Sequence, residues 1–336
     1  MTQYLSNKLT VLYTVLIVMV VYIHSSYIEA NQYDIARFLQ NLTGGGICRI
    51  ANCLFFCISG YLFARNIHSI NDIWPKLLKR TRTLLLPYLL WNIIFVLWYV
   101  VIENLPGISA FSNTHIIEVC ANQSVGETLY SLFIAPAAFQ LWFLRDLMVM
   151  LLFTPLLWWI ARKQWIVALV LALASTFVYA WLIYFWLGII IAVKQWDIEN
   201  YRRPKMAVFI SALIYVGYAV YVAWGGTSAR VVEVFVNIVG LYLVWSLYDI
   251  AACGQYLADK GLWKYLCGYS FFIYCFHEPA FNVIKKLALA VCGTSEPVLI
   301  FFYYVNPWLM VLAAVAVAKI LQRMTPNIYK ILTGGR

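Results

Sequence analysis

A small set of ionisable and amide side chains lies within or beside long apolar runs, and these residues could do chemistry. They are His24, Arg49, Asn52, Arg145, Asp146, His277 and Glu278. A neutral imidazole can accept a proton from a hydroxyl near neutral pH, because its pKa is about 6.5. Arginine and asparagine N–H groups can stabilise an oxyanion where the dielectric is low. The two acids could orient an imidazole or balance a cation. The residue types therefore indicate acid-base chemistry.

His24 lies in the stretch VLYTVLIVMVVYIHSS, residues 11–26, which is otherwise apolar. An ionisable side chain inside a membrane-spanning helix is costly, and it usually faces a cavity and has a function. The alternative is a histidine satisfied at the membrane surface. Position alone favours neither interpretation.

The composition predicts a membrane protein with many spans. Of the 336 residues, 64% are hydrophobic and 11% charged, and the mean hydropathy of +0.79 excludes an ordinary soluble domain. The net charge of +10 comes from short basic clusters between apolar runs, which is typical of cytoplasmic loops and not of nucleic-acid binding. The first run is longer than the apolar part of a signal peptide and no cleavage site follows it, so we expect it to stay in the mature chain.

Ten apolar runs predict the helices that must position these residues. The runs are 9–28, 46–64, 83–102, 140–161, 165–178, 180–193, 206–224, 231–250, 268–290 and 298–320. We expect an all-α, polytopic transmembrane bundle of about ten helices that forms a single domain over residues 1–336. We see no internal repeat of the kind found in many transporters.

The distribution of lysine and arginine predicts the orientation. With the N-terminus inside, the inner segments collect most of the basic residues: Lys8, Arg65, Lys76, Lys79, Arg80, Arg82, Arg162, Lys163, Lys194, Arg202, Arg203, Lys205, Lys260, Lys264, Lys319, Arg323, Lys330 and Arg336. Both termini are then cytoplasmic. The outer loop 103–139 has Glu103, Glu118 and Glu127 and no basic residue, whereas Lys285 and Lys286 run against the rule and either snorkel outward or line the site.

This topology places the polar residues at a similar depth. His24, Arg49 with Asn52, Arg145 with Asp146, and His277 with Glu278 all fall in the outer part of their helices, since each helical residue advances about 1.5 Å. Several polar residues at one level predict a shared cavity. The alternative is a set of separate local ion pairs, of which Arg145 and Asp146 could be members.

Two further segments could bind a ligand. Lys79, Arg80 and Arg82 precede the third apolar run and form either a topology signal or a site for a phosphorylated cofactor, because arginine binds phosphate through a bidentate fork. In FFCISGYLF, residues 55–63, the small residues Ser59 and Gly60 interrupt an aromatic run. They would let another helix or a thin ligand chain approach closely.

The eight cysteines include Cys48, Cys53 and Cys57, whose spacing contains no CxxC pair. We interpret most of them as small buried hydrophobic residues, and we predict no metal site. Cys120 and Cys292 would lie in or near outer segments, and they could pair in an oxidising compartment.

Five stretches, in this order, resemble the integral-membrane acyltransferase family 3. They are the helix with His24, FFCISGYLF at 55–63, KRTRTLLLPY at 79–88, LWFLRDLMVMLLFTPLLWW at 141–159 and FFIYCFHEP at 271–279. The resemblance implies a ten-helix inner-membrane protein. It would move an acyl group, commonly acetyl, from coenzyme A to a hydroxyl of a cell-envelope glycan or its lipid-linked precursor.

The resemblance also assigns roles to residues. His24 corresponds to the family's catalytic histidine, and Arg80 and Arg82 to a basic pair suited to the coenzyme A phosphates. The family usually has an arginine eleven residues before the histidine; here that position is Tyr13, with Lys8 the nearest cation. The role of that arginine must therefore be filled differently in this chain or not at all.

We predict that His24 acts as general base in acyl transfer from acetyl-CoA. The rest of the expected catalytic set consists of Arg145, Asp146, His277 and Glu278. We expect the donor to bind at Lys79, Arg80, Arg82 and Ser59, and the acceptor substrate to bind at Arg49, Asn52 and Trp142. About 25 Å would separate the basic cluster from His24 along a straight helix. An extended pantetheine arm could bridge much of that distance and allow direct transfer, or His24 could carry the acyl group.

Two other functions compete with this prediction: a transporter or flippase of a glycolipid or acylated solute, and a structural membrane subunit. The basic cluster, the two histidines and the absence of a repeat favour the enzyme. The acceptor, the acyl length, the face at which the acceptor binds and the oligomeric state do not follow from these residues.

Overall fold

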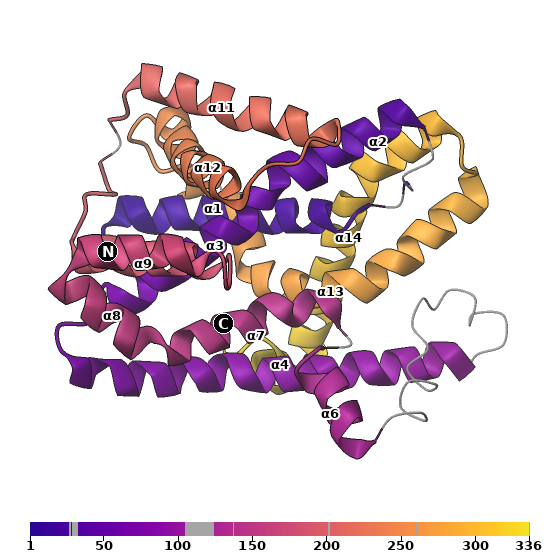
Figure 1. The fold of residues 1–336 in the computed structure, drawn as a ribbon. Helices are drawn as coiled ribbons and strands as arrows, with labels where there is room; N and C mark the ends of the chain where they lie inside the picture. Colours follow the sequence, from indigo (N-terminus) through magenta and orange to yellow (C-terminus); the bar gives the residue numbers. More distant parts are fainter. Residues whose placement is uncertain are drawn as a thin grey trace. The chain divides into compact units, whose positions relative to one another are not determined.

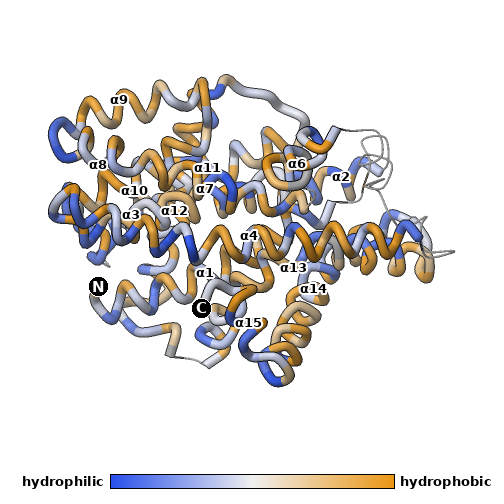
Figure 2. Tube along the Cα trace, turned by 90° about the horizontal axis from the view of Figure 1, so that it is seen from below, coloured by the Kyte–Doolittle hydropathy of each residue, from blue (hydrophilic) through white to orange (hydrophobic). Residues whose placement is uncertain are grey.

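The apolar runs form helices because a chain inside a bilayer must satisfy its backbone N–H and C=O groups internally. The structure, a computed structural model, describes residues 1–26, 28, 33–104, 124–136, 138–200, 202–259 and 261–335. Within these ranges every regular element is a helix, which confirms the all-α class (Figure 1). Figure 2 colours most of the helical trace as hydrophobic and the connection between α8 and α9 as hydrophilic.

The chain divides into two compact units. Unit 1 consists of residues 1–76 and 152–270, and unit 2 of residues 77–151 and 271–336. The helices of unit 1 are α1 (Gln3–Ile23), α2 (Asp34–Gln40), α3 (Ile50–Ala64), α8 (Thr154–Lys163), α9 (Trp165–Ser175), α10 (Leu182–Val193), α11 (Lys205–Ala223) and α12 (Arg230–Ala252). Unit 2 has α6 (Val125–Phe133), α7 (Trp142–Leu152), α14 (Glu296–Met324) and α15 (Pro326–Leu332). Helices α4 (Ile73–Asn104) and α13 (Gly261–Cys292) contribute residues to both units.

The closest helix packing in unit 1 is that of α3 against α10, and two glycines make it possible. A Cβ added to Gly60 would lie 2.0 Å from the Phe185 carbonyl oxygen, and one added to Gly188 would lie 2.0 Å from the Cys57 carbonyl oxygen. The backbones are therefore in direct contact, as small residues allow in membrane helices. Gly60 serves helix packing, which was one of the two interpretations of this stretch.

The second predicted span begins earlier than the apolar run suggests. A continuous helical segment of 31 residues runs from Asp34 to Ala64. It passes from α2 through a π-helical segment, η1 (Asn41–Gly46), and a 3₁₀ turn, η2 (Ile47–Arg49), into α3. The predicted start at residue 46 was therefore wrong, because the polar residues of α2 hid the first turns. Single π-helical turns within helices often mark functional sites.

The predicted helix 140–161 is broken. After a 3₁₀ turn, η5 (Phe139–Leu141), helix α7 ends at Leu152 and α8 begins at Thr154. Pro155 lies in the first turn of α8, where a residue without a backbone N–H can start a helix but cannot continue the preceding one. The single helix predicted here was wrong, and Pro155 explains the break.

The core of unit 2 is aromatic. Trp91 of α4 packs against Phe272 of α13, with 5.4 Å between ring centroids, and Phe272 stacks on Tyr329 of α15 at 5.7 Å. The Trp91 indole N–H donates to the Leu332 carbonyl oxygen at 3.1 Å and so holds the end of α15. Gly334 then turns the chain with a φ of +66°. A Cβ added there would lie 2.2 Å from the Thr83 carbonyl oxygen, so this turn needs a glycine.

By length and composition, six described helical segments could span a membrane. They are α1, 34–64, 70–104, α11, α12 and α14, and the broken pair formed by α7 and α8 would add a seventh. Each predicted run overlaps described helices, and several of these could span a membrane, so a multi-pass membrane protein is confirmed. The number of ten spans and the sides of the membrane on which the termini lie stay predictions.

Candidate active site

His24 lies just beyond the end of α1, not within the helix. The helix ends at Ile23, and His24 caps it with φ −92° and ψ 0°, its backbone N–H donating to the carbonyl oxygens of Val21 and Tyr22. The predicted helix end at residue 28 was wrong, because hydropathy alone does not show that the helix stops and a turn begins at His24. The side chain is half-buried, and as a cap residue it is not confined to the helix face.

The chain after His24 is held by Gln40 of α2, which the sequence analysis did not single out. The Ile28 backbone N–H donates to Gln40 Oε1 at 3.1 Å, and Gln40 Nε2 donates to the Ile28 carbonyl oxygen at 3.2 Å. Both residues are buried. This paired amide replaces the helical hydrogen bonds that end at α1, and it fixes the path of the chain four residues after the histidine.

Arg49 and Asn52 lie at the start of α3, in an element that packs on α1. Arg49 ends the 3₁₀ turn η2 and is exposed, whereas Asn52 is half-buried in the first turn of α3. The elements η1, η2 and α3 all contact α1. The Tyr215 hydroxyl donates to the Ile47 carbonyl oxygen at 3.0 Å and so satisfies a carbonyl at the change from π to 3₁₀ geometry. Unit 1 thus brings the elements of His24, Arg49 and Asn52 together.

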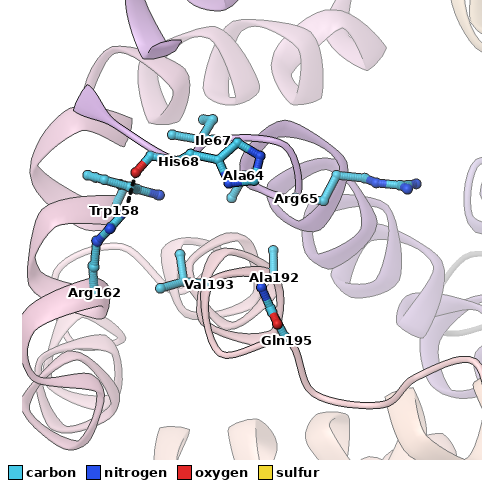
Figure 3. Close-up of a pocket in the computed structure, with 9 residues that line it drawn as sticks. All are labelled: Ala64, Arg65, Ile67, His68, Trp158, Arg162, Ala192, Val193 and Gln195. Carbon is cyan, nitrogen blue, oxygen red and sulfur yellow. Dashed lines mark hydrogen bonds between the residues drawn. The ribbon is translucent and has the colours of Figure 1, made fainter. Parts of the chain in front are cut away.

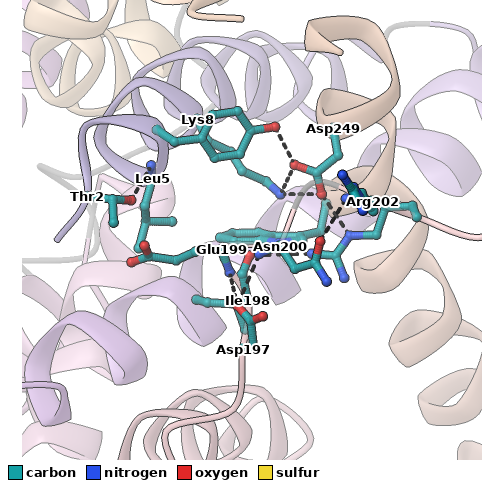
Figure 4. A network of polar contacts seen from close by, with 12 residues as sticks. Thr2, Leu5, Lys8, Asp197, Ile198, Glu199, Asn200, Arg202 and Asp249 are labelled. Atoms are coloured by element: carbon teal, nitrogen blue, oxygen red, sulfur yellow. Dashed lines mark hydrogen bonds and ion pairs between the residues drawn. The ribbon is translucent and has the colours of Figure 1, made fainter. Parts of the chain in front are cut away.

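Lys8, the cation nearest to Tyr13 in the sequence, belongs to a buried ion cluster (Figure 4). Its ammonium contacts both carboxylate oxygens of Asp249 at 2.7 and 2.8 Å. Arg203 Nε and the Tyr4 hydroxyl each donate to the same carboxylate at 2.8 Å. The side chains of Lys8 and Asp249 are fully buried. Tyr13 itself packs on Phe55, with 5.6 Å between ring centroids.

Arg145 and Asp146 of α7 pair with each other in unit 2. Arg145 Nε lies 2.8 Å from Asp146 Oδ1, and the guanidinium also donates to the Ile134 carbonyl oxygen at 2.6 Å. Asp146 is buried, whereas the Arg145 side chain keeps 33% of its exposure. The two residues form a local ion pair, which was one of the two alternatives predicted for them.

His277 of α13 lies near the start of α7 through a clasp that the sequence analysis missed. Gln140 Nε2 donates to the Cys275 carbonyl oxygen at 2.9 Å, and the Tyr274 hydroxyl donates to the Gln140 carbonyl oxygen at 2.5 Å. His277 is fully buried, and its Nδ1 lies 2.8 Å from the Tyr274 carbonyl oxygen. Because a carbonyl only accepts, Nδ1 carries the proton and Nε2 is the basic nitrogen.

The remaining predicted residues also belong mainly to unit 2. Glu278 accepts from the Asn282 amide at 3.3 Å. Lys285, whose position ran against the charge rule, is buried with its ammonium 4.6 Å from the Phe281 ring centroid, so it lies inside the unit. Trp142 is half-buried at the start of α7 and packs on Phe143.

The basic cluster lies on α4, also in unit 2: Lys79 and Arg82 are exposed and Arg80 is half-exposed. Ser59 is half-buried on α3 of unit 1. The predicted site thus draws on both units: His24, Arg49, Asn52 and Ser59 from unit 1, and the others from unit 2. The single shared cavity stays a prediction.

Cys48, Cys53 and Cys57 are free and buried, as expected for small hydrophobic residues. Among the described residues no group of three histidine, cysteine or acidic side chains could hold a metal ion. Cys120, Glu118, Lys260 and Arg336 lie outside the described ranges, and so does the predicted Cys120–Cys292 pair.

The described part of the chain is all-helical and has six or seven candidate spans, which defines a multi-pass membrane protein. Comparison with known families makes this specific. Residues 7–321 match the acyltransferase domain family, so the chain belongs to that family and is an acyltransferase. The match includes His24, the basic cluster and His277.

Among curated proteins, the chain is similar to the succinoglycan biosynthesis protein ExoH of Rhizobium meliloti (strain 1021). The two are 25% identical over 355 aligned positions, which cover 98% of this chain and 92% of that protein. No solved structure matches the chain.

Proposed function

We propose that this membrane acyltransferase moves an acetyl group from acetyl-CoA to a hydroxyl of a cell-envelope glycan or lipid-linked sugar. The family membership supplies the reaction class. The acceptor class rests on the relative whose name refers to succinoglycan, a polysaccharide. Acyl-CoA is the donor that the resemblance implies, with its phosphates on Lys79, Arg80 and Arg82.

The single observation that carries the assignment of the base is the position of His24 as a half-buried cap at the end of α1. A general base must approach the acceptor hydroxyl to about 2.6–3.2 Å. His24 meets this requirement better than His277, which is fully buried within α13. His277, with its basic Nε2, would act on the reaction only from inside unit 2.

In the proposed step, the His24 imidazole removes the proton of the acceptor hydroxyl as its oxygen attacks the thioester carbonyl. A carbon–oxygen bond forms, the carbon–sulfur bond breaks, and the coenzyme A thiolate takes up the proton from the imidazolium. Arg49, Asn52 or Arg145 would donate to the oxyanion of the tetrahedral intermediate. Asp146 or Glu278 would balance the positive charge that develops.

The test uses purified full-length protein with labelled acetyl-CoA and an envelope glycan extract. The wild type should transfer label to the glycan, and His24→Ala should lose the transfer. Lys163→Ala is the matched control, because Lys163 is an exposed cation at the end of α8 outside the proposed site. A wild type that is folded but transfers no label to any fraction of the extract would contradict the proposal.

The same material separates direct transfer from an acyl-enzyme. Direct transfer, which we favour, leaves no label on the protein when donor is present alone. Label retained on the wild-type chain and absent from His24→Ala would instead indicate that His24 carries the acyl group.

A further inference from the structure

A cavity of about 290 Å³ lies in unit 1, and none of the predicted site residues lines it. It is bounded by the end of α3 and the turn that follows, by α8, and by the end of α10 (Figure 3). Figure 3 places Trp158 and Arg162 of α8 beneath the main chain at His68, with Gln195 on the opposite side and Arg65 at the edge, its side chain extended outward. The volume is near the lower limit of small-molecule sites, roughly 300 Å³.

The cavity is cationic. Arg65 and Arg162 line it together with His68, and no acidic residue is among the side chains that line it. No carboxylate in the described part of the chain lies within ion-pair distance of either guanidinium. This contrasts with Lys8 and Arg203 of the same unit, which share Asp249. Cations that lack an acidic partner in a concave site attract an anion.

The cavity also contains an unsatisfied donor. Trp158 is buried, and in the described structure its indole N–H has no hydrogen-bond acceptor. Arg162 stacks on the same indole, with its guanidinium 5.0 Å from the ring centroid. A buried N–H without an acceptor costs about 1–3 kcal/mol, so an acceptor oxygen in the cavity would relieve a penalty already present.

The turn that forms one wall is held independently of any ligand. The backbone N–H groups of His68 and Ser69 donate to the Asp72 carboxylate at 2.9 and 2.8 Å. Arg162 Nη1 donates to the His68 carbonyl oxygen and so fixes the guanidinium against the turn. The donors are therefore preorganised, which lowers the entropic cost of binding.

We propose that this cavity binds phosphate groups and that its ligand is the nucleotide part of coenzyme A, an assignment that rests on the proposed function. Arginine presents a planar fork that matches phosphate oxygens, and the Trp158 N–H adds a donor. Arg65 and Arg162 both belong to segments that the sequence predicts on the cytoplasmic side, where acyl-CoA is available. Because all the phosphates of coenzyme A belong to its nucleotide part, the cavity would be an alternative to Lys79, Arg80 and Arg82 as their binding site.

The experiment measures the binding of coenzyme A to the full chain in lipid nanodiscs by isothermal titration calorimetry. Arg162→Gln should raise the dissociation constant about ten-fold to a hundred-fold, the loss of one charge-assisted contact. Arg162→Lys keeps the charge without the fork, and Trp158→Phe keeps a ring without the N–H, so both should give a smaller rise. Lys163→Gln, which removes the neighbouring cation outside the cavity, should bind as the wild type does.

Competition identifies the part of the ligand that is bound. ADP should displace coenzyme A, pantetheine should not, and binding should be equal in zwitterionic and anionic nanodiscs. Displacement by anionic lipid without displacement by ADP would overturn the donor assignment in favour of a lipid headgroup. Unchanged binding in Arg162→Gln, or an equal loss in Lys163→Gln, would overturn the site.

The two proposals can fail separately. Arg162-dependent binding of coenzyme A without acyl transfer would keep this site and contradict the proposed function. Acyl transfer that depends on His24, with the same KM for acetyl-CoA in Arg162→Gln as in the wild type, would keep the function and contradict this site.

Discussion

Removing the carboxylate of Asp249 should destabilise the protein more than the loss of any surface ion pair. Asp249 accepts hydrogen bonds from Lys8, Arg203 and Tyr4, and its side chain and that of Lys8 are fully buried. The Lys8 ammonium also lies 4.0 Å from the Trp245 ring centroid. In Asp249→Ala the buried ammonium would lose its carboxylate and keep the Trp245 and Tyr248 rings beside it.

The size of the effect follows from what is left behind. Removing one partner of a buried ion pair costs about 3–5 kcal/mol, because the other charge loses its compensation. Arg203 contributes less to the loss, since its side chain keeps 15% of its exposure and can reach water. We therefore expect Asp249→Ala to lower the free energy of unfolding by about 3–5 kcal/mol.

The assay is equilibrium unfolding in mixed micelles with Asp34→Ala as the control. Asp34 pairs with Arg37 on the surface, with side chains 89% and 40% exposed, so its loss should cost no more than about 1 kcal/mol. The triple variant Lys8→Met, Arg203→Met, Asp249→Leu should recover most of the loss, since apolar replacements of a buried ion cluster are often neutral. Equal effects of Asp249→Ala and Asp34→Ala would refute the reasoning.

Three other substitutions test the fold and the support of the site. Gly60→Ala would place a Cβ 2.0 Å from the Phe185 carbonyl oxygen and should lower the free energy of unfolding by at least about 1–3 kcal/mol. The control is Gly217→Ala, whose new Cβ would have no neighbouring atom within 4 Å, so this variant should be as stable as the wild type or more stable. Equal stabilities of the two variants would contradict the close packing of α3 on α10. Gln40→Leu removes both hydrogen bonds to Ile28 and leaves the buried backbone groups of Ile28 unpaired. The free energy of unfolding should therefore fall by about 2 kcal/mol, and acyl transfer should slow. A variant as stable as the wild type would contradict a structural role for the Gln40–Ile28 hydrogen bonds. The Ser124 hydroxyl and backbone N–H hold the pKa of Glu127 below its ordinary value of 4.5. The stability that the Glu127 carboxylate gives to the start of α6 is therefore complete above about pH 4.5 and is lost as the pH falls through the lower pKa of the folded state. Amide-exchange protection of α6 should fall with acid in the wild type but not in Glu127→Gln, and identical pH profiles would argue against this role of Glu127.

The positions of the helices were largely predictable, because apolar runs of spanning length leave the backbone few alternatives. The errors occur where a local signal interrupts a run. Pro155 indicates the break between α7 and α8. The three glycines at the end of η1 indicate the π-helical turn there. The polar triplet from His24 to Ser26 marks the true end of α1.

The partners of the polar residues were not predictable from one sequence. Lys8 meets Asp249 across 241 positions, and Gln140 meets the Cys275 carbonyl across 135. No periodicity within a helix links residues so far apart. Arg65 and Arg162 were interpreted only as topology signals, because their common cavity exists only once α3, α8 and α10 pack together.

The most direct test of the central claim is the single-turnover rate of acyl transfer in His24→Ala, measured with saturating labelled acetyl-CoA and the glycan acceptor. A general base contributes about 10²–10⁴-fold to such a step. We predict a loss of that size, with coenzyme A binding and thermal unfolding as in the wild type. A His24→Ala rate within a few-fold of the wild-type rate would contradict the assignment of His24 as the base.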